Sequence, residues 1–180
     1  FAEGVLIIGV GRSATKQLGL FLNHSRKTYR ATLQLGTVST TDDPEGQRME
    51  CIGAVLPSLS VVEQTLKKFV GEIWQTPPRF SALKINGERA YNKARRGEQV
   101  VMEPRQVFIE EIRLISYQGA ELVIEVTCGS GTYIRSIARA LGEVWGTGAY
   151  LTRLIRTRVR VPEYSEYDFT SEKSEKIENP

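Results

Sequence analysis

The segment VTCGSGTYIRSIARALGE, residues 126–143, runs from a strand pattern through a glycine turn into a helix pattern. The strand-like run Glu121–Cys128 precedes the turn Gly129-Ser130-Gly131, and Gly146 is a typical stop signal for the helix that follows. The apolar side chains of this helix recur at three- and four-residue intervals, at Ile134, Ile137, Ala138, Leu141, Val144 and Trp145. The segment therefore predicts a strand, a tight turn and a helix with one buried face.

Arg135 falls in the first turn of that helix. Free backbone N–H groups and the helix dipole favour an anion at this end of a helix. Arginine is most often a solvated surface residue, but the neighbouring Ile134 and Ile137 are expected to be buried. An arginine so close to a core usually holds a carboxylate or a phosphate. Arg135 is therefore a candidate site residue, with a solvated helix arginine as the alternative.

The rest of the chain mixes strand and helix patterns without the regular alternation of a parallel α/β sheet. The patterns predict a helix with the stripe Ala14, Leu18, Phe21 and Leu22 that ends near Asn23, strands at Thr28–Leu35, Val107–Ile115 and Leu151–Val161, a loop at Thr37–Gln47, and a helix at about Val61–Ile73 with a Ser60–Glu63 capping box. We expect an α+β fold with a mixed, mostly antiparallel central sheet flanked by helices.

The first apolar run, Val5–Ile8, is typical of a strand and ends in Gly9-Val10-Gly11. These glycines fit the local pattern of a dinucleotide-binding turn. Such a site needs an acidic residue roughly 20 positions later, at the end of a second strand, and the sequence has Lys27-Thr28-Tyr29-Arg30 there. A dinucleotide site is therefore disfavoured, and the segment does not have the spacing of a phosphate-binding P-loop.

The composition indicates one soluble domain: 180 residues, of which 41% are hydrophobic and 25% charged. The sequence offers neither a membrane-spanning run nor a signal peptide, so we expect a cytoplasmic protein without membrane contact. Its cysteines, Cys51 and Cys128, and its one histidine, His24, are too few for a disulfide framework, a metal cluster or Ser-His catalysis. No metal site is expected.

The charge is unevenly distributed. Residues 163–180 carry a net charge of −4, and residues 1–162 carry +7. A basic body suits a polyanionic partner such as RNA, because phosphate contacts release counterions. A merely solvated surface is the alternative.

Residues 75–105 have no long apolar period after Pro77-Pro78. Their basic side chains outnumber the acidic ones and are interleaved with Phe80 and Tyr91; they are Arg79, Lys84, Arg89, Lys93, Arg95, Arg96 and Arg105. Basic side chains with aromatic rings between them can hold a phosphate backbone and stack on bases. The segment is a candidate RNA-binding element, or else an exposed basic loop.

Four ordered segments together resemble one family: KTYRATLQLGTVSTTDDPEG, PPRFSALKINGERAYNKARRGE, VTCGSGTYIRSIARALGE and GTGAYLTRLIRTRV. They are similar in order and spacing to motifs of bacterial tRNA pseudouridine synthases of the TruB type, over about residues 1–159. The resemblance implies a pseudouridine synthase fold and the isomerisation of uridine to pseudouridine in the T-loop of tRNA, at position 55. It also implies base flipping, with no cofactor and no metal.

By this resemblance, residues 1–162 are the catalytic domain without its N-terminal portion, and residues 75–105 are a thumb-like insertion that clasps the T stem-loop. Residues 163–180 are an acidic tail. The family's nucleophilic aspartate lies in a G-x-L-D-P loop before the strand that matches Ala2–Ile8, so it would lie just upstream of Phe1. The chain as given would then be inactive alone, and the glycines at 9 and 11 would be turn and packing residues.

The resemblance assigns catalytic-site roles to Tyr29, Arg135 and Leu154. Tyr29 would pack on the flipped base and take part in proton transfer, Arg135 would pair with the nucleophile, and Leu154 would line the base pocket. Tyr29 and Leu154 could instead be simple core residues. The expected RNA-binding residues are Arg79, Lys84, Arg89, Tyr91, Lys93, Arg95 and Arg96. Asp42 and Asp43 match an acidic loop to which no direct chemical role is assigned.

A second function class remains open at this point. A chain without the nucleophile could be a non-catalytic module that binds or folds tRNA. The sequence does not indicate an oligomeric state.

Overall fold

The computed structural model describes residues 2–85, 87–161 and 164–170. The elements are, in chain order, β1 (Ala2–Gly4), α1 (Gly11–His24), β2 (Arg26–Leu35), β3 (Thr37–Ser39), β4 (Arg48–Glu50), α2 (Leu59–Lys68), β5 (Gly71–Gln75), β6 (Lys84–Ile85), β7 (Glu88–Arg89), α3 (Ala90–Arg95), β8 (Arg105–Gln118), β9 (Glu121–Cys128), α4 (Ile134–Trp145), β10 (Ala149–Val161) and β11 (Tyr164–Thr170).

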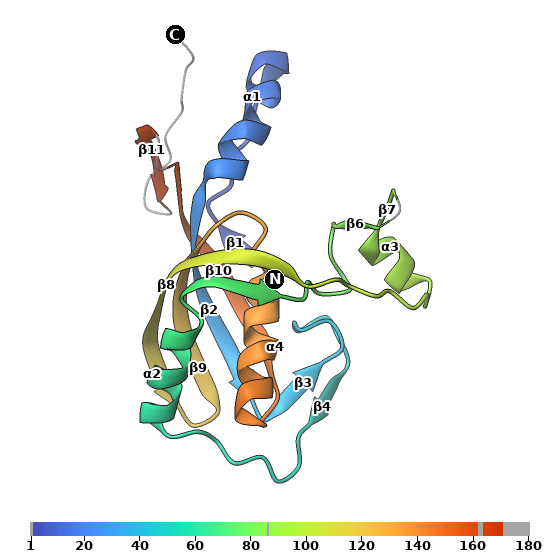
Figure 1. Cartoon of the computed structure of the whole chain (residues 1–180), viewed down its shortest axis with the longest axis vertical. Coiled ribbons are helices and arrows are strands. Elements are labelled where there is room, and N and C mark those ends of the chain that lie inside the picture. The colour runs from blue at the N-terminus through green and yellow to red at the C-terminus, as the bar shows by residue number, and fades with distance from the viewer. Residues whose placement is uncertain (1, 86, 162–163, 171–180) are drawn as a thin grey trace.

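The main sheet has the strand order β1-β10-β2-β9-β8-β5, and β11 also pairs with β10. β1 runs parallel to β10, whereas the other described neighbours in this sheet are antiparallel. Two short hairpins, β3–β4 and β6–β7, lie outside it. The predicted α+β fold, with a mixed and mostly antiparallel sheet flanked by helices, is therefore confirmed (Figure 1).

The core lies between one face of the sheet and the helices α4 and α2 (Figure 1). Alternate residues of the strands are buried there, including Ala31, Leu33, Leu35, Leu122, Ile124 and Val126. From α4, Ile134, Ile137, Ala138 and Leu141 are buried, whereas Val144 is exposed, unlike the sequence prediction. Each fully buried leucine or isoleucine stabilises the fold by about 1.5–3 kcal/mol.

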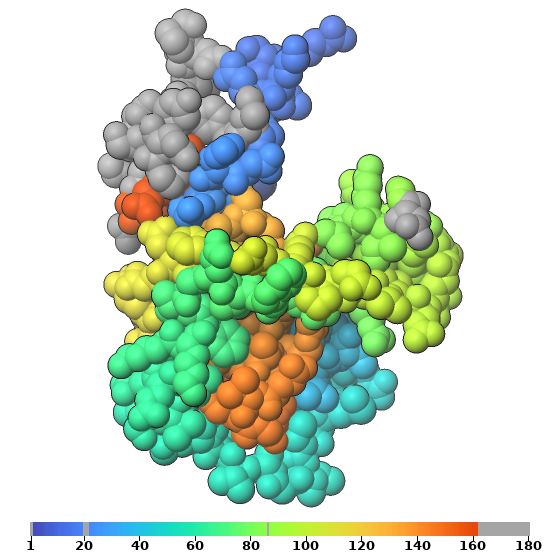
Figure 2. Space-filling view, in the orientation of Figure 1, coloured from blue at the N-terminus to red at the C-terminus, as the bar shows by residue number. Residues whose placement is uncertain are grey.

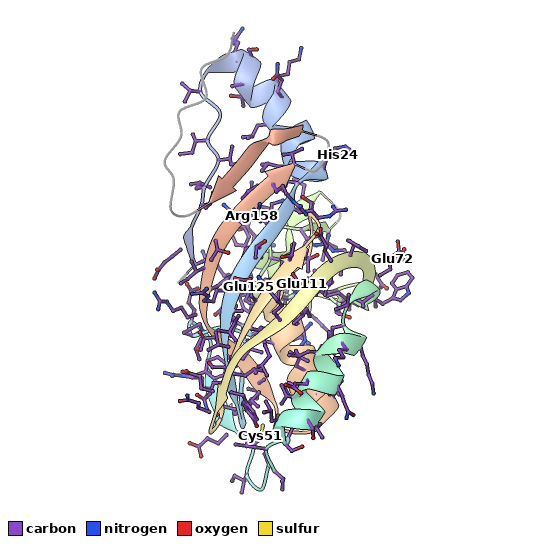
Figure 3. The ribbon with its side chains drawn as sticks, turned by 90° about the vertical axis from the view of Figure 1, so that its left-hand side faces the viewer. His24, Cys51, Glu72, Glu111, Glu125 and Arg158 are labelled. Carbon is purple, nitrogen blue, oxygen red and sulfur yellow. The ribbon has the colours of Figure 1, made fainter. Side chains whose placement is uncertain are left out.

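The opposite face of the sheet carries charged and hydroxyl side chains (Figure 3). Glu110 accepts a hydrogen bond from Arg160 at 2.8 Å and lies 3.4 Å from Arg26. Arg113 pairs with Glu125 on the neighbouring strand. Exposed ion pairs contribute only about 0–1 kcal/mol each, so the apolar face holds the fold together.

The helix predicted at Val61–Ile73 is wrong at both ends. α2 begins at Leu59, and its N-cap is Ser58, whose Oγ accepts a hydrogen bond from Val61 N at 3.4 Å. The Ser60–Glu63 capping box is therefore also wrong. Gly71 has a φ of 99°, a conformation that glycine adopts readily, and the residues after it pair with β8 as β5.

The strand predicted at Val5–Ile8 is also wrong. β1 covers only Ala2–Gly4, and the side chains of Leu6 and Ile8 are 70% and 72% exposed. α1 starts at Gly11, earlier than its apolar stripe indicated. At the other end of the chain, β11 lies within the predicted acidic tail and continues the sheet beside β10; residues 163 and 171–180 of that tail lie outside the described residues.

Residues 76–104, between β5 and β8, project from the sheet as a separate lobe (Figures 1 and 2). We refer to this segment as the arm. It contains β6, β7 and α3 and has its own small apolar cluster of Ala90, Val100 and Met102. Because this cluster is separate from the main core, the direction of the arm depends on the contacts at its two ends.

The packing of α4 against β10 depends on Gly142. A Cβ atom at this position would overlap the backbone of Gly148 and Ala149. Gly142 O also accepts hydrogen bonds from Thr147 N at 3.0 Å and Gly148 N at 3.1 Å, which close the turn between helix and strand. The absence of a side chain therefore lets the helix and the strand meet backbone to backbone.

We expect Gly142→Ala to lower the free energy of unfolding by about 1–3 kcal/mol, because the added methyl group must push β10 away. Urea unfolding measures the change. Gly19→Ala in α1 is the matched control: Gly19 has open space around its Cβ position, so alanine there should be neutral or stabilising by up to about 1 kcal/mol. Equal stability of Gly142→Ala and the wild type would contradict the close approach.

Candidate active site

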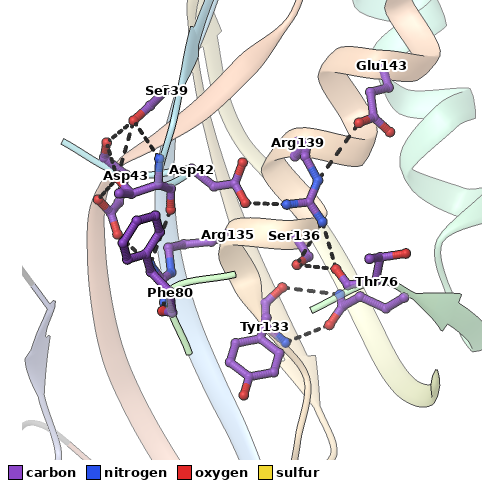
Figure 4. A network of polar contacts seen from close by, with 12 residues as sticks. Ser39, Asp42, Asp43, Thr76, Phe80, Tyr133, Arg135, Ser136, Arg139 and Glu143 are labelled. Carbon is purple, nitrogen blue, oxygen red and sulfur yellow. Dashed lines mark hydrogen bonds and ion pairs between the residues drawn. The ribbon is translucent and has the colours of Figure 1, made fainter. Parts of the chain in front are cut away.

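Arg135 is carried by the first turn of α4, and its guanidinium bonds to two other segments (Figure 4). Nη1 donates to Asp43 Oδ2 at 2.6 Å and to Thr41 O at 3.2 Å. Nη2 donates to Phe80 O at 2.9 Å. The Arg135 side chain is 20% exposed, so it is not a solvated helix arginine, and the carboxylate that it holds is that of Asp43.

The turn after β3 is folded around the carboxylate of Asp43. Asp43 Oδ1 accepts hydrogen bonds from Thr41 Oγ1 and, at 3.1 Å, from Glu45 N, while Oδ2 faces Arg135. Ser39 Oγ donates to Asp43 O at 2.6 Å. With 2% of the residue exposed, both carboxylate oxygens are used inside the protein, and the charge of Asp43 is matched by that of Arg135.

The preceding residue, Asp42, pairs with a second arginine of α4. Its Oδ2 faces Arg139 Nη1, one helical turn beyond Arg135 (Figure 4). Burial raises the pKa of Asp42 above its ordinary value, and the charges of Arg139 and Arg135 oppose that rise. Two adjacent aspartates of one turn therefore face two arginines of one helix.

The two ends of the arm are held by the same end of α4. Gln75, the residue before the arm, accepts a hydrogen bond from Tyr133 N at 2.8 Å and donates one to Tyr133 O at 3.2 Å. Arg105, the residue after the arm, donates to Gly131 O at 2.8 Å, and its guanidinium lies 5.0 Å from the centre of the Tyr133 ring. The glycine turn and the start of α4 therefore fix both ends of the arm.

Tyr29 lies on β2, half-buried against the main core, and faces the side of the sheet that α4 covers. Burial raises the pKa of Tyr29. Arg156 opposes that rise through its positive charge and through a hydrogen bond with the Tyr29 side chain. Arg156 lies opposite Tyr29 on β10, and its Nε donates to Val5 O at 2.6 Å. The Tyr29 hydroxyl therefore stays protonated at neutral pH.

Leu154 also packs against the main core, and lies opposite Ala31 of β2 and Ala2 of β1. Gly4 of β1 approaches Arg156 so closely that a Cβ would overlap its carbonyl group. Three strands thus bring Tyr29, Leu154 and the start of the chain together on the face that Ile134, the neighbour of Arg135, also packs against.

The predicted RNA-binding residues all lie in the arm. Its exposed side chains among them are Arg79, Lys84, Arg89, Arg95 and Arg96, and the half-buried ones are Tyr91 and Lys93. The guanidinium of Arg95 lies 5.5 Å from the centre of the Tyr91 ring. The arm therefore presents a cationic surface with one aromatic ring among the charges.

Arg96 differs from its basic neighbours because its charge is matched inside the arm. It donates to Glu98 at 2.6 Å and to both carboxylate oxygens of Glu88, at 2.6 and 3.0 Å. It joins β7 to the end of α3, and its RNA-binding role stays a prediction.

Four polar residues of this region were not assigned a role from the sequence: Asp42, Asp43, Arg139 and Arg156. Arg139 follows Arg135 by four positions, so the two share one face of a helix, and this spacing is a signal that could have found it. For the two aspartates, the signals were a pair of adjacent acids before Pro44 and the match to an acidic loop, and neither indicated which residues they contact.

Two classes of feature are absent from the described part of the chain. Within residues 2–85, 87–161 and 164–170, no three His, Cys, Asp or Glu side chains are grouped closely enough to hold a metal ion. Over the same residues, each helix is too short or too polar to cross a membrane.

Comparison with known proteins identifies relatives across most of the chain. The family profile described as "TruB family pseudouridylate synthase (N terminal domain)" matches residues 1–134. A protein of Bacteroides fragilis named tRNA pseudouridine synthase B is 46% identical over 162 residues, which are 88% of this chain and 67% of the relative. Proteins of the same name from Acaryochloris marina and Mycobacterium bovis are 46% and 41% identical; the matches cover 87% and 88% of this chain and 54% of each relative.

The chain therefore spans between about half and two thirds of the length of these relatives. Among solved structures, it is similar to a chain of "Crystal Structure of a Cbf5-Nop10-Gar1 Complex", with a TM-score of 0.57 and 25% identity over 82% of this chain and 34% of that one. The resemblance drawn from the four motifs is confirmed: this protein belongs to the TruB family of pseudouridylate synthases.

Proposed function

We propose that the full-length protein isomerises a uridine of tRNA to pseudouridine, at position 55 of the T-loop. In this reaction the N1–C1′ glycosidic bond breaks, the uracil rotates, and a C5–C1′ bond forms. The proton on C5 leaves and N1 gains one, so the reaction needs neither an oxidant nor a second substrate. Relatives that carry the name tRNA pseudouridine synthase B support this function, and the cytoplasm is its proposed place of action.

The observation that carries the proposal is which N–H groups of the Arg135 guanidinium already have hydrogen-bond partners. A guanidinium has five N–H donors, and the contacts with Asp43, Thr41 and Phe80 occupy two on Nη1 and one on Nη2. A guanidinium presents its Nε–H and one Nη2–H along one edge, and none of these three contacts uses the Nε–H of Arg135. Such an edge accepts a carboxylate in a bidentate way, which is what a nucleophilic aspartate held in its ionised form requires.

The nucleophile itself would come from the residues that precede Phe1. β1 runs parallel to β10, with Ala2 opposite Leu154, so the chain before β1 would continue alongside β10 towards Leu151. Leu151 N donates to Asp42 O at 3.1 Å, and Asp42 is the neighbour of the Arg135 partner Asp43. An upstream aspartate would thus arrive beside the turn that Arg135 holds.

Tyr29 and Leu154 would form the base site. Both are half-buried on the face that Arg135 borders, and a flipped uracil needs apolar and aromatic surface to replace its lost stacking. An ordinary tyrosine is protonated at neutral pH, and burial raises the pKa of Tyr29 further, so its hydroxyl can donate a proton or a hydrogen bond.

The arm would hold the T stem-loop of the tRNA. Its exposed cationic side chains and the Tyr91 ring offer phosphate and stacking contacts of the kind that RNA-binding surfaces use. The rival function, a tRNA-binding module without catalysis, shares this surface and differs only at Arg135 and the upstream carboxylate.

We expect Arg135→Ala in the full-length protein to lower the turnover number much more than it lowers the affinity for tRNA. Tritium released from tRNA labelled at C5 of uridine measures turnover, because the new bond replaces that hydrogen, and the wild type should release about one equivalent, from position 55. Loss of the charge that holds the nucleophile should lower kcat by about 10²-fold or more, while the Kd for tRNA changes by less than about threefold.

Arg113→Ala, on the opposite face of the sheet, where Arg113 pairs with Glu125, is the matched control and should act as the wild type does. If the wild type binds tRNA and releases no tritium, the protein is the non-catalytic module. Equal losses of turnover and binding in Arg135→Ala would place Arg135 in RNA binding instead.

For the arm, we expect the double variant Lys93→Gln/Arg95→Gln to weaken tRNA binding and to flatten its salt dependence. Each lost phosphate contact reduces the slope of log K against log salt concentration by roughly 0.7–0.9, and filter binding at several salt concentrations measures it. Lys67→Gln/Lys68→Gln on α2 removes the same charge away from the arm (Figure 1) and should leave the slope unchanged. An unchanged slope in the arm variant would remove the arm from the RNA interface.

A further inference from the structure

Arg139 holds the start of the arm in a way that parallels Arg135. Its Nη1 pairs with Asp42 Oδ2, and its Nη2 donates to Thr76 O at 2.7 Å and to Ser136 Oγ at 3.4 Å (Figure 4). Ser136 Oγ donates to the same Thr76 carbonyl at 2.8 Å. Since Thr76 is the first residue of the arm, Arg139 connects a buried carboxylate directly to the start of the arm.

Asp42 is itself held rigidly by the body of the protein. Its backbone has a φ of 62°, the one positive value outside glycine in the described residues, and aspartate and asparagine tolerate this conformation best. Asp42 O accepts a hydrogen bond from Leu151 N of β10 at 3.1 Å, and the side chain is only 12% exposed. The carboxylate therefore offers Arg139 a fixed anchor.

The sequence of the arm makes the carbonyl of Thr76 important. Pro77 and Pro78 follow it and are buried, and neither has an N–H group with which to bond the body. Beyond them, Arg135 holds the carbonyl of Phe80. The two arginines thus fix the segment 76–80 on both sides of the proline pair. Together with the bonds of Gln75 and Arg105 to the start of α4, this segment sets the direction in which the arm leaves the sheet.

The Asp42–Arg139 pair lines a groove that the residues of the proposed base site do not line. A groove of about 640 Å³ lies between α4, β5 and residues 99–102 of the arm, and Asp42, Thr76 and Arg139 line it, whereas Tyr29, Leu154 and Arg135 do not. The further partner of Arg139 is Glu143, whose carboxylate lies 3.8 Å away and is 69% exposed. Besides each other, the side chains of the pair bond to Thr76, Ser136 and Glu143 and not to Tyr29, Leu154 or Arg135. We refer to residues 76–80 as the arm root.

We propose that Asp42 and Arg139 are positioning residues for RNA binding: together they fix the direction of the arm so that it meets the RNA without a search through other orientations. The inference rests on the proposed function in taking tRNA as the ligand of the arm. The structural part of the proposal is that Asp42 and Arg139 hold the arm root in place. This part does not depend on the ligand and can be measured on the RNA-free protein.

The test uses Asp42→Asn, Arg139→Gln, Arg139→Lys and the Asp42→Asn/Arg139→Gln double variant of the full-length protein, with Glu143→Gln as the matched control. Asparagine keeps the positive φ, and lysine keeps the charge opposite Asp42 while losing the second donor to Thr76. The first readout is the rate of cleavage of the RNA-free protein by a lysine-specific protease at Lys84 and Lys93, followed by the masses of the fragments. Arg139→Lys itself adds one lysine in α4, whose fragments have different masses and are counted separately, and the other variants neither add nor remove a lysine. The second readout is steady-state turnover of tRNA.

We expect Asp42→Asn and Arg139→Gln each to raise the rate of cleavage in the arm and the KM for tRNA by about tenfold, which corresponds to about 1.4 kcal/mol, and to leave kcat within about twofold. The double variant should show the same cleavage rate and KM as either single variant, because both substitutions break the same Asp42–Arg139 ion pair. Arg139→Lys should be intermediate, and Glu143→Gln should behave as the wild type does.

Unchanged cleavage and KM in Arg139→Gln would overturn the proposal, and so would a fall in kcat at constant KM. If Arg139→Gln does not fold, Arg139→Lys and Asp42→Asn decide by the same two readouts. If the wild type has no activity on tRNA, the proposed function fails; faster cleavage of the variants would then still support the holding of the arm root, and unchanged cleavage would overturn that as well.

Discussion

The structure depends on the pairing of one charge, the Arg135 guanidinium, in a place that water reaches poorly. Packing Ile134 and Ile137 against the sheet carries Arg135 inward on the first turn of α4. An unpaired charge there would be costly, and the turn after β3 supplies Asp43 to match it. The hydrophobic packing of a helix thus forces the formation of a polar cluster at one end of the core.

The same cluster joins parts of the molecule with different tasks. Through Arg135 and Arg139, α4 contacts the acidic turn on one side and the arm root on the other. The arm has only a small apolar cluster of its own, so its direction depends on these polar contacts and on those of Gln75 and Arg105 with the start of α4. RNA binding and catalysis are therefore linked through two arginines one turn apart on a single helix, and each arginine can be substituted without the other.

The sequence predicted what local periodicity determines. The strand alternation of β2 and the buried face of α4 follow from side-chain spacing, and the apolar neighbours of Arg135 indicated a buried ion pair. The partner was not predictable, because Asp43 lies 92 residues away and adjacent acids in a turn are equally typical of a solvated loop. The end of α2 was missed since Val70 and Ile73 fit a helical stripe as well as a strand, and only the pairing of β5 with β8 decides between them.

A double-mutant cycle between Asp43 and Arg135 tests the central ion pair most directly. The free energies of unfolding of the wild type, Asp43→Asn, Arg135→Gln and the double variant give their coupling energy. A partly buried, hydrogen-bonded pair that organises its surroundings should show a coupling of about 2 kcal/mol or more. A coupling below about 0.5 kcal/mol, the range of exposed pairs, would mean that the acidic turn and α4 fold independently, and would contradict the account.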